Sequence, residues 1–115
     1  MPKLTTAKLS IIGKSGKKYL FNIYPTDTSF KDIGAVYLFT KRELATDKKH
    51  YHTLIYCGIT GDLSERFNNH HKGDCIEKND ANCICTMSIE KEEMRKQIEA
   101  DILKAKNCAC NEVLN

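Results

Sequence analysis

Short segments of alternating or continuous apolar residues recur along the chain and predict several β-strands. Residues 8–12 and 18–24 have strand-like composition, and the glycine-bounded residues 13–16 between them suit a turn. The first part of the chain is therefore predicted to form a β-hairpin. Pro25 lacks a backbone donor and should end the second strand, and residues 25–33 then form a connector.

Three later segments have the apolar character of core strands. Residues 34–40 form a nearly continuous apolar run, which indicates a central strand covered on both faces. Residues 52–57 predict the next strand, antiparallel to the first across a charged surface loop at 41–51. Residues 83–89 predict another core strand, and the hydrophilic residues 72–82 before it are expected to be irregular.

A helix is predicted directly after the strand at 52–57. Gly58 and Gly61 suit a tight turn because glycine tolerates unusual backbone angles. Asp62 then fits the N-cap of a helix over residues 62–72, with Glu65 as its capping-box partner.

The clearest helix is predicted over residues 90–106. Acidic residues occupy its first turn and lysines its last, which complements the helix dipole. Glu99 lies at the edge of its apolar stripe. The stripe consists of Met94, Ile98, Ile102 and Ala105. Together these elements predict one small α+β domain over residues 1–115, with an antiparallel sheet flanked by helices.

Composition narrows the class of protein without deciding its function. The chain has 115 residues, of which 41% are hydrophobic and 29% charged, as in an ordinary globular domain. The net charge of +3 is too small to argue for nucleic acid by itself, although it does not oppose it. No apolar run approaches membrane-spanning length and no signal-peptide core is found, so we expect no membrane association and a cytoplasmic location.

Six cysteines allow three interpretations. A disulfide scaffold lacks the support of a signal peptide. Structural zinc is suggested by two C-x-C pairs, although ordinary zinc knuckles use wider spacings. The favoured interpretation is free thiols that are partly buried as small hydrophobic side chains. The cysteines are Cys57, Cys75, Cys83, Cys85, Cys108 and Cys110.

Six polar residues near strand ends and helix flanks are candidates for chemistry. Each one also has an ordinary structural role, such as a packed strand tyrosine or a solvated helix arginine. Together they offer a metal ligand, a positive charge for a phosphate and a candidate base, a set suited to phosphodiester cleavage. The candidates are Tyr37, Tyr56, Arg66, His70, Glu99 and Asn111.

The order and spacing of these residues resemble the GIY-YIG nuclease family. The matching positions are Ala35-Val36-Tyr37, Tyr56-Cys57-Gly58, Arg66, His70, and the later Glu99 and Asn111. The resemblance covers about residues 34–111. The whole chain is similar to the small stand-alone bacterial members of the family. It implies the α+β fold of that family, a three-stranded antiparallel sheet flanked by helices, to which residues 8–33 are an N-terminal addition.

The resemblance implies a divalent-metal-dependent endonuclease that hydrolyses phosphodiester bonds in DNA. Glu99 would hold a single Mg²⁺ or Mn²⁺, for which its hard oxygen ligand is suited. Arg66 would neutralise charge that develops on the phosphate.

The remaining implied roles concern the attacking water and the support of the site. Tyr37 would orient or deprotonate the water, and His70 beside it is the better proton acceptor near neutral pH. His71 adjoins His70, so this assignment rests on spacing. Tyr56 would position the phosphate or the water, and Asn111 would brace the site.

Departures from the family pattern leave alternatives open. Ala35 stands where glycine is usual, and Cys57 replaces an apolar branched residue. One alternative is a nucleic-acid-binding module of the same fold without useful catalysis, and another is a zinc-stabilised interaction protein. A protein partner that supplies substrate binding is a further option.

We expect substrate contacts in the loop at 41–51 and the hairpin at 8–24, which lie outside the catalytic pattern.

Overall fold

The computed structural model describes residues 3–66 and 73–111. Within these residues the fold is α+β, as predicted, and none of the helices is long and apolar enough to cross a lipid bilayer. The elements in chain order are β1 (Lys8–Ile12), β2 (Lys18–Pro25), β3 (Ala35–Leu44), β4 (His50–Thr60), α1 (Leu63–Arg66), α2 (Gly73–Lys78), β5 (Cys83–Ser88) and α3 (Glu92–Ala105).

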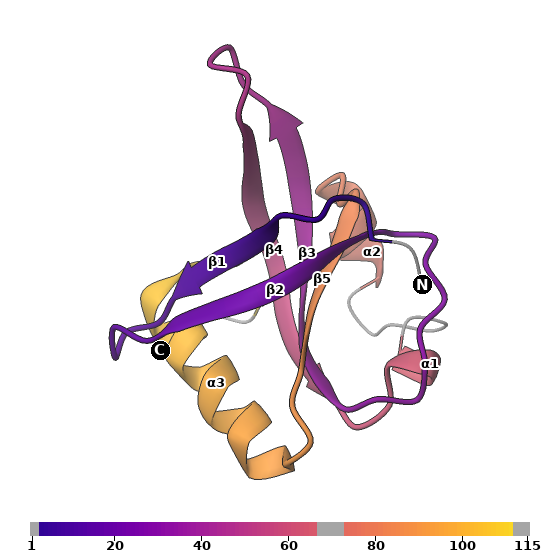
Figure 1. Cartoon of the computed structure of the whole chain (residues 1–115), viewed down its shortest axis with the longest axis vertical. Coiled ribbons are helices and arrows are strands. Elements are labelled where there is room, and N and C mark those ends of the chain that lie inside the picture. The colour runs from indigo at the N-terminus through magenta and orange to yellow at the C-terminus, as the bar shows by residue number, and fades with distance from the viewer. Residues whose placement is uncertain (1–2, 67–72, 112–115) are drawn as a thin grey trace.

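The five strands form one antiparallel sheet in the order β1-β2-β5-β3-β4. The strands curl across one another, and α3 lies on the opposite side of the sheet from α1 and α2 (Figure 1). The predicted N-terminal hairpin is confirmed, and β2 joins it to β5. The sheet therefore consists of a three-stranded unit, β5-β3-β4, extended by two strands.

Strand β3 is central to the fold. Residues 35–40 are all buried, which confirms the prediction of a strand covered on both faces. Leu38 joins the apolar cluster beneath α3, on what we call the α3 face of the sheet. Tyr37 joins a second cluster with Leu63 of α1 and Ile76 of α2, on the α1–α2 face. The near-continuous apolar run follows from this double burial.

The loop predicted at residues 41–51 is wrong, because β3 and β4 continue as a paired hairpin through most of it. β5 begins at Cys83, opposite Thr40, and residues 41–53 beyond that point pair with no other strand of the described residues. We call residues 41–53 the arm; it projects from the sheet at the top of Figure 1. Polar residues can form such strands because hairpin pairing satisfies the backbone without burying the side chains.

The irregular segment predicted at 72–82 is also wrong in part, because α2 occupies its first half. Ile76 of this short helix is buried on the α1–α2 face, and Cys75 packs beside it. Tertiary packing of one apolar turn overrides the hydrophilic composition of the segment.

The predicted N-cap of α1 is confirmed, but its capping box is not formed. The Ser64 backbone N–H donates to Asp62 Oδ1 at 2.9 Å. The Asp62 N–H, which Glu65 would accept in a capping box, instead donates to Thr60 Oγ1 at 3.0 Å. The rest of the helix predicted at 62–72 lies outside the described residues.

Helix α3 confirms the second predicted helix with a rotated apolar stripe. Ile98 and Ile102 are buried as predicted, whereas Met94 is 48% exposed and Ala105 is also exposed. Arg95 occupies the buried position that the apolar pattern gave to Met94. Its long side chain reaches backbone carbonyls before the helix, which the apolar pattern does not reveal.

Asp101 attaches α3 to the N-terminal hairpin. Its carboxylate accepts hydrogen bonds from the Ser15 N–H (2.8 Å), the Ser15 hydroxyl (2.6 Å) and the Tyr19 hydroxyl (2.7 Å). A Cβ atom on Gly13 would collide with the same carboxylate, so glycine lets Asp101 approach the turn in this position. Hydrogen bonds from Ser15 and then Tyr19 lower the pKa of Asp101.

This carboxylate predicts a pH-dependent loss of stability. A group whose pKa is lower in the folded state stabilises the fold above its unfolded pKa, and the contribution is lost as the pH falls through the folded value. We expect Asp101→Asn to be less stable than wild type at pH 7, with the difference shrinking below about pH 4. Urea unfolding across this range measures the effect, with Asp27→Asn in the β2–β3 connection as the control. A difference that is independent of pH would contradict the account.

Candidate functional site

Two of the predicted site residues, Tyr37 and Tyr56, meet over Gly58. Tyr37 of β3 pairs directly with Gly58 of β4, and Tyr56 lies two residues before Gly58 on the same face. The tyrosine rings have a centroid separation of 6.1 Å and an interplanar angle of 36°. A Cβ atom on Gly58 would lie 2.6 Å from Tyr37 Oη and 2.7 Å from Tyr56 Cε2. Gly58 is therefore a strand residue that makes room for both rings, not the predicted turn glycine.

The tyrosine pair is enclosed. Tyr37 has no exposed surface, and Tyr56 is 7% exposed. The ring of Tyr37 also meets Phe39 edge-on at 6.0 Å. Water reaches the Tyr37 hydroxyl only if its surroundings move, whereas Tyr56 is the more accessible of the two phenols.

Asn111 binds the free edge of β4 beside this pair. Its Nδ2 donates to the Cys57 carbonyl at 3.0 Å, and its Oδ1 accepts from the Cys57 N–H at 2.9 Å. The Cys110 N–H donates to the Ile55 carbonyl at 2.7 Å. The C-terminal segment thus satisfies the edge of β4 that no strand covers in the described residues.

A disulfide between Cys75 and Cys110 links this segment to α2. The interpretation of the cysteines as free thiols is therefore wrong for these two, and a zinc site that used Cys110 as a thiolate is incompatible with the bond. The interpretation is confirmed for the other cysteines, which are free and buried: Cys57, Cys83, Cys85 and Cys108.

Burial makes the free thiols poor nucleophiles and poor metal ligands. Desolvation raises the pKa of Cys85 to about 12 and that of Cys108 to about 11. The thiolate is the reactive form, so these side chains stay protonated near neutral pH. The same burial raises the pKa of Cys57, and the charges of Cys108 and Glu99 raise it further.

Glu99 approaches the same stretch of β4 from the other side of the sheet. It is half-buried on α3, and its charge is close enough to raise the pKa of the Cys57 thiol. Cys57 lies on the α3 face, whereas the two tyrosines lie on the α1–α2 face. Four predicted site residues therefore lie around residues 56–58 of β4 but not on one face of the sheet. They are Tyr37, Tyr56, Glu99 and Asn111.

The other predicted residues are placed only in part. Arg66 ends α1, a short distance along the chain from β4, but its side chain is outside what the structure describes. His70 and His71 lie outside the described residues, so the choice between them stays a prediction.

The donor chemistry of the site suits a magnesium-like ion better than a soft metal. No group of three or more His, Cys, Asp or Glu side chains in residues 3–66 and 73–111 is arranged to hold a metal. A single carboxylate such as Glu99 fits Mg²⁺, which keeps several waters and takes one or two carboxylates together with substrate phosphate oxygens.

Arg95 is a buried cation that the sequence patterns missed. Its Nη1 donates to the carbonyls of Ile89 (2.8 Å) and Glu90 (2.9 Å), while its Nε is buried without a hydrogen-bond partner. It lines two adjoining hollows of about 260 and 560 Å³ that also share Gly61. Its spacing of three and seven residues from Ile98 and Ile102 is the signal that could have placed it on the buried face.

A second missed feature is the contact between Asp32 and Asp62 before α1. A hydrogen bond to Asp62 and its negative charge raise the pKa of Asp32. The same carboxylate of Asp62 caps α1, so this pair has a structural role at the helix N-terminus.

Comparisons with known proteins give no assignment. No protein-family model matches the chain, and no match was found among curated proteins or solved structures.

The tight packing at Gly58 predicts a specific stability loss. Gly58→Ala forces a methyl group between two buried rings, and overpacking of this kind costs about 1–3 kcal/mol. Urea unfolding measures the loss. Gly73→Ala in α2 is the matched control, because an added Cβ there meets no atom of the described residues within 4 Å. Equal stability of the two variants would show that the rings do not depend on the glycine.

The disulfide predicts a redox-dependent stability. It joins residues separated by 35 positions, and closing a loop of this size contributes about 4 kcal/mol in the chain-entropy account. A reducing agent should lower the Tm of the wild type and leave that of Cys75→Ser/Cys110→Ser unchanged. An equal response of both proteins would argue against the bond.

Proposed function

We propose that the chain is a divalent-metal-dependent endonuclease of GIY-YIG type that hydrolyses phosphodiester bonds in DNA. The single observation that carries the proposal is the convergence of Tyr37 and Tyr56 over Gly58, beside the β4 edge that Asn111 binds. Two strand tyrosines, a glycine without room for a side chain and a distant asparagine meet at the positions that the sequence resemblance selected.

The topology supports the same proposal. The expected three-stranded antiparallel sheet corresponds to β5-β3-β4, with β3 in the centre. The order of elements after the hairpin, two strands, two short helices, a strand and a long helix, places Glu99 on the last helix and Arg66 on the first. The N-terminal hairpin extends the sheet at the β5 side, at the opposite end of the strand order from β4.

The proposed roles follow the resemblance, and Glu99 would act from the opposite face of the sheet to the two tyrosines. Tyr56, the less enclosed phenol, positions the phosphate. Tyr37 packs against Tyr56 and is fully buried, so it meets the attacking water only when substrate binding moves the residues that cover it. Asn111 fixes β4 at Cys57. Glu99 would hold a Mg²⁺ or Mn²⁺ ion, which when bound polarises the phosphate and stabilises the leaving oxygen.

Arg66 and His70 complete the proposal from the sequence. Arg66 would neutralise charge on the phosphate, and His70 would accept the proton of the attacking water.

We place the protein in the cytoplasm, where disulfides are rare, so the Cys75–Cys110 bond would be reduced there.

Removal of the metal ligand provides the test of the proposal. Glu99→Ala should lower metal-dependent cleavage of supercoiled plasmid and branched DNA by about a hundredfold or more, because a bound metal supplies several kcal/mol of transition-state stabilisation. Glu93→Ala, at an exposed glutamate on the first turn of the same helix, is the matched control and should cleave like wild type.

The assay compares Mg²⁺, Mn²⁺ and EDTA, with unfolding curves to show that each variant is folded. Undiminished cleavage by folded Glu99→Ala would refute the assignment of the metal ligand. No cleavage by folded wild type in any metal would favour a DNA-binding module without catalysis.

A further inference from the structure

The arm, residues 41–53, is a two-stranded ribbon that stands clear of the rest of the sheet. Four residue pairs, from Lys41 opposite Thr53 to Leu44 opposite His50, pair with no other strand of the described residues. A tight turn closes the ribbon, with the Ala45 N–H donating to the Lys49 carbonyl at 2.9 Å. Lys48 holds the turn with a positive φ of 67°.

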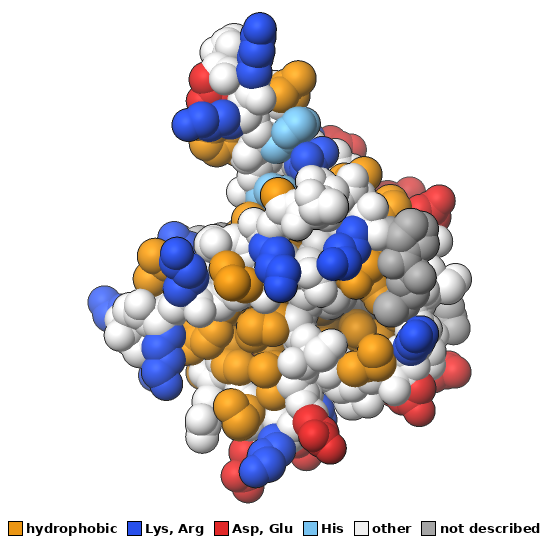
Figure 2. All heavy atoms as spheres, viewed as in Figure 1, with side chains coloured by type: hydrophobic (Ala, Val, Ile, Leu, Met, Phe, Trp, Pro, Cys, Tyr) orange, Lys and Arg blue, Asp and Glu red, His pale blue; other side chains and the backbone are white. Residues whose placement is uncertain are grey.

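Positive charge is concentrated on this ribbon. Residues 41–53 contain four Lys or Arg and two Asp or Glu, so the arm has a net charge of +2 out of +3 for the whole chain. Basic and histidine side chains follow the projecting arm in Figure 2. Half of the four histidines of the chain, His50 and His52, also lie there.

Both acidic side chains of the arm are engaged locally. Glu43 lies 3.9 Å from Lys41. Asp47 accepts hydrogen bonds from the Tyr51 hydroxyl (2.7 Å) and the Lys49 N–H (2.9 Å) within the turn. Lys48 and Lys49 are exposed at the tip, where they can meet an external anion.

One face of the ribbon carries a guanidinium group, two imidazoles and an apolar side chain. Arg42 pairs with His52, and Leu44 pairs with His50, so these four side chains share a face without a carboxylate. Burial and the positive charges of Arg42 and His50 lower the pKa of His52. Arg42 Nε is buried without a hydrogen-bond partner. The guanidinium of Arg42 can therefore meet an anion brought to this face.

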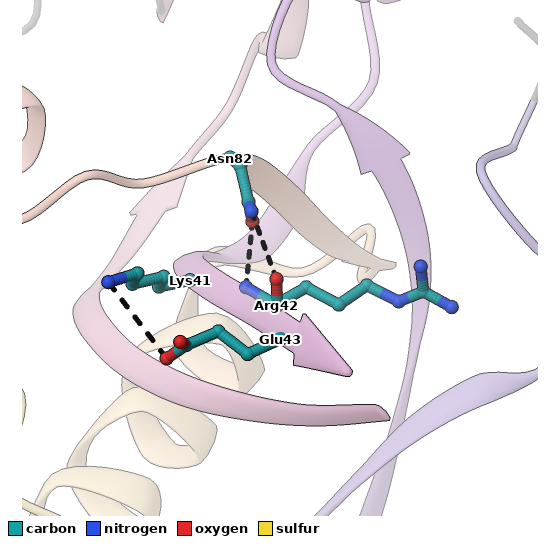
Figure 3. A network of polar contacts seen from close by, with 4 residues as sticks. All are labelled: Lys41, Arg42, Glu43 and Asn82. Carbon is teal, nitrogen blue, oxygen red and sulfur yellow. Dashed lines mark hydrogen bonds and ion pairs between the residues drawn. The ribbon is translucent and has the colours of Figure 1, made fainter. Parts of the chain in front are cut away.

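Asn82 fixes the base of the arm to the sheet. Its side chain accepts from the Arg42 N–H (2.7 Å) and donates to the Arg42 carbonyl (3.0 Å), which continues the β5 pairing by one residue (Figure 3). Its own N–H donates to the Thr40 carbonyl at 3.0 Å. The ribbon is thus held at its root in a defined direction, and little ordering is needed on binding.

We infer that the arm enters the major groove of duplex DNA and that Lys48 and Lys49 contact the phosphates at its rim. The B-form major groove, about 12 Å wide and 8.5 Å deep, admits a two-stranded β-ribbon. Four residue pairs span about 13 Å, which is comparable to the width of the groove, so a ribbon lying across the groove brings its tip to the phosphates at the rim. This inference deepens the proposed function and rests on it for the identity of the substrate.

The geometry favours duplex DNA over duplex RNA. The A-form major groove of RNA is deep and narrow and excludes such an element. A protein partner is disfavoured, because the ribbon tip presents lysines and the arm has an excess of positive charge.

Binding of a labelled DNA duplex, measured by fluorescence anisotropy between about 50 and 200 mM salt, tests the inference. The variant is Lys48→Asn/Lys49→Ala, in which asparagine tolerates the left-handed backbone at position 48. We expect its affinity to fall about tenfold or more and its salt slope to fall by about 2. Lys104→Ala/Lys106→Ala, two exposed lysines at the end of α3 and outside both segments expected to contact substrate, is the matched control and should bind within about twofold of wild type.

Several outcomes would overturn the inference. They are equal losses in both double variants, unchanged binding by the arm variant, equally tight binding of an RNA duplex of the same sequence, or no DNA binding by wild type. Cleavage measured in parallel separates the two proposals. If wild type binds DNA through the arm but does not cleave it, the inference about the arm is supported and the proposed nuclease activity is refuted. If wild type cleaves DNA and the arm variant binds and cleaves it equally well, the nuclease activity is supported and the inference about the arm is refuted.

Discussion

The pairing of β3 on both of its edges is the constraint on which the rest of the structure depends. β4 and β5 bond to it from either side, and its residues 35–40 are buried on both faces. Through β5 it carries the N-terminal hairpin, and through its two faces it supports α3 on one side and α1 and α2 on the other. A polar residue in this segment is tolerated only where its polar group finds a partner.

The candidate site and the arm are two ends of the same strand pair. Tyr37 and Lys41 are four residues apart on β3, a rise of about 13 Å. The C-terminal segment completes this end of the sheet, because Asn111 and Cys110 bond to the edge of β4 and the Cys75–Cys110 disulfide links them to α2.

The sequence predicted those elements of the fold that short stretches of residues specify by themselves. The hairpin at 8–24 has a glycine turn, and the core strand at 34–40 has a continuous apolar run, so both were found. The arm, α2 and the buried position of Arg95 were missed because each depends on partners distant in sequence. Hairpin pairing forms strands from polar residues at 41–53, and backbone carbonyls accept the hydrogen bonds of Arg95.

The site was predictable to a similar extent. The spacing of residues in the sequence predicted that Tyr37 and Tyr56 belong to one site. It did not reveal that Gly58 makes room for their rings or that Asn111 hydrogen-bonds the backbone of Cys57. The most direct test of the central claim is Mn²⁺-induced broadening of backbone amide NMR signals with duplex DNA present. The account predicts broadening centred on Glu99 and Cys57 that is absent in Glu99→Ala. Broadening centred on Asp32 and Asp62, or equal broadening in the variant, would contradict it.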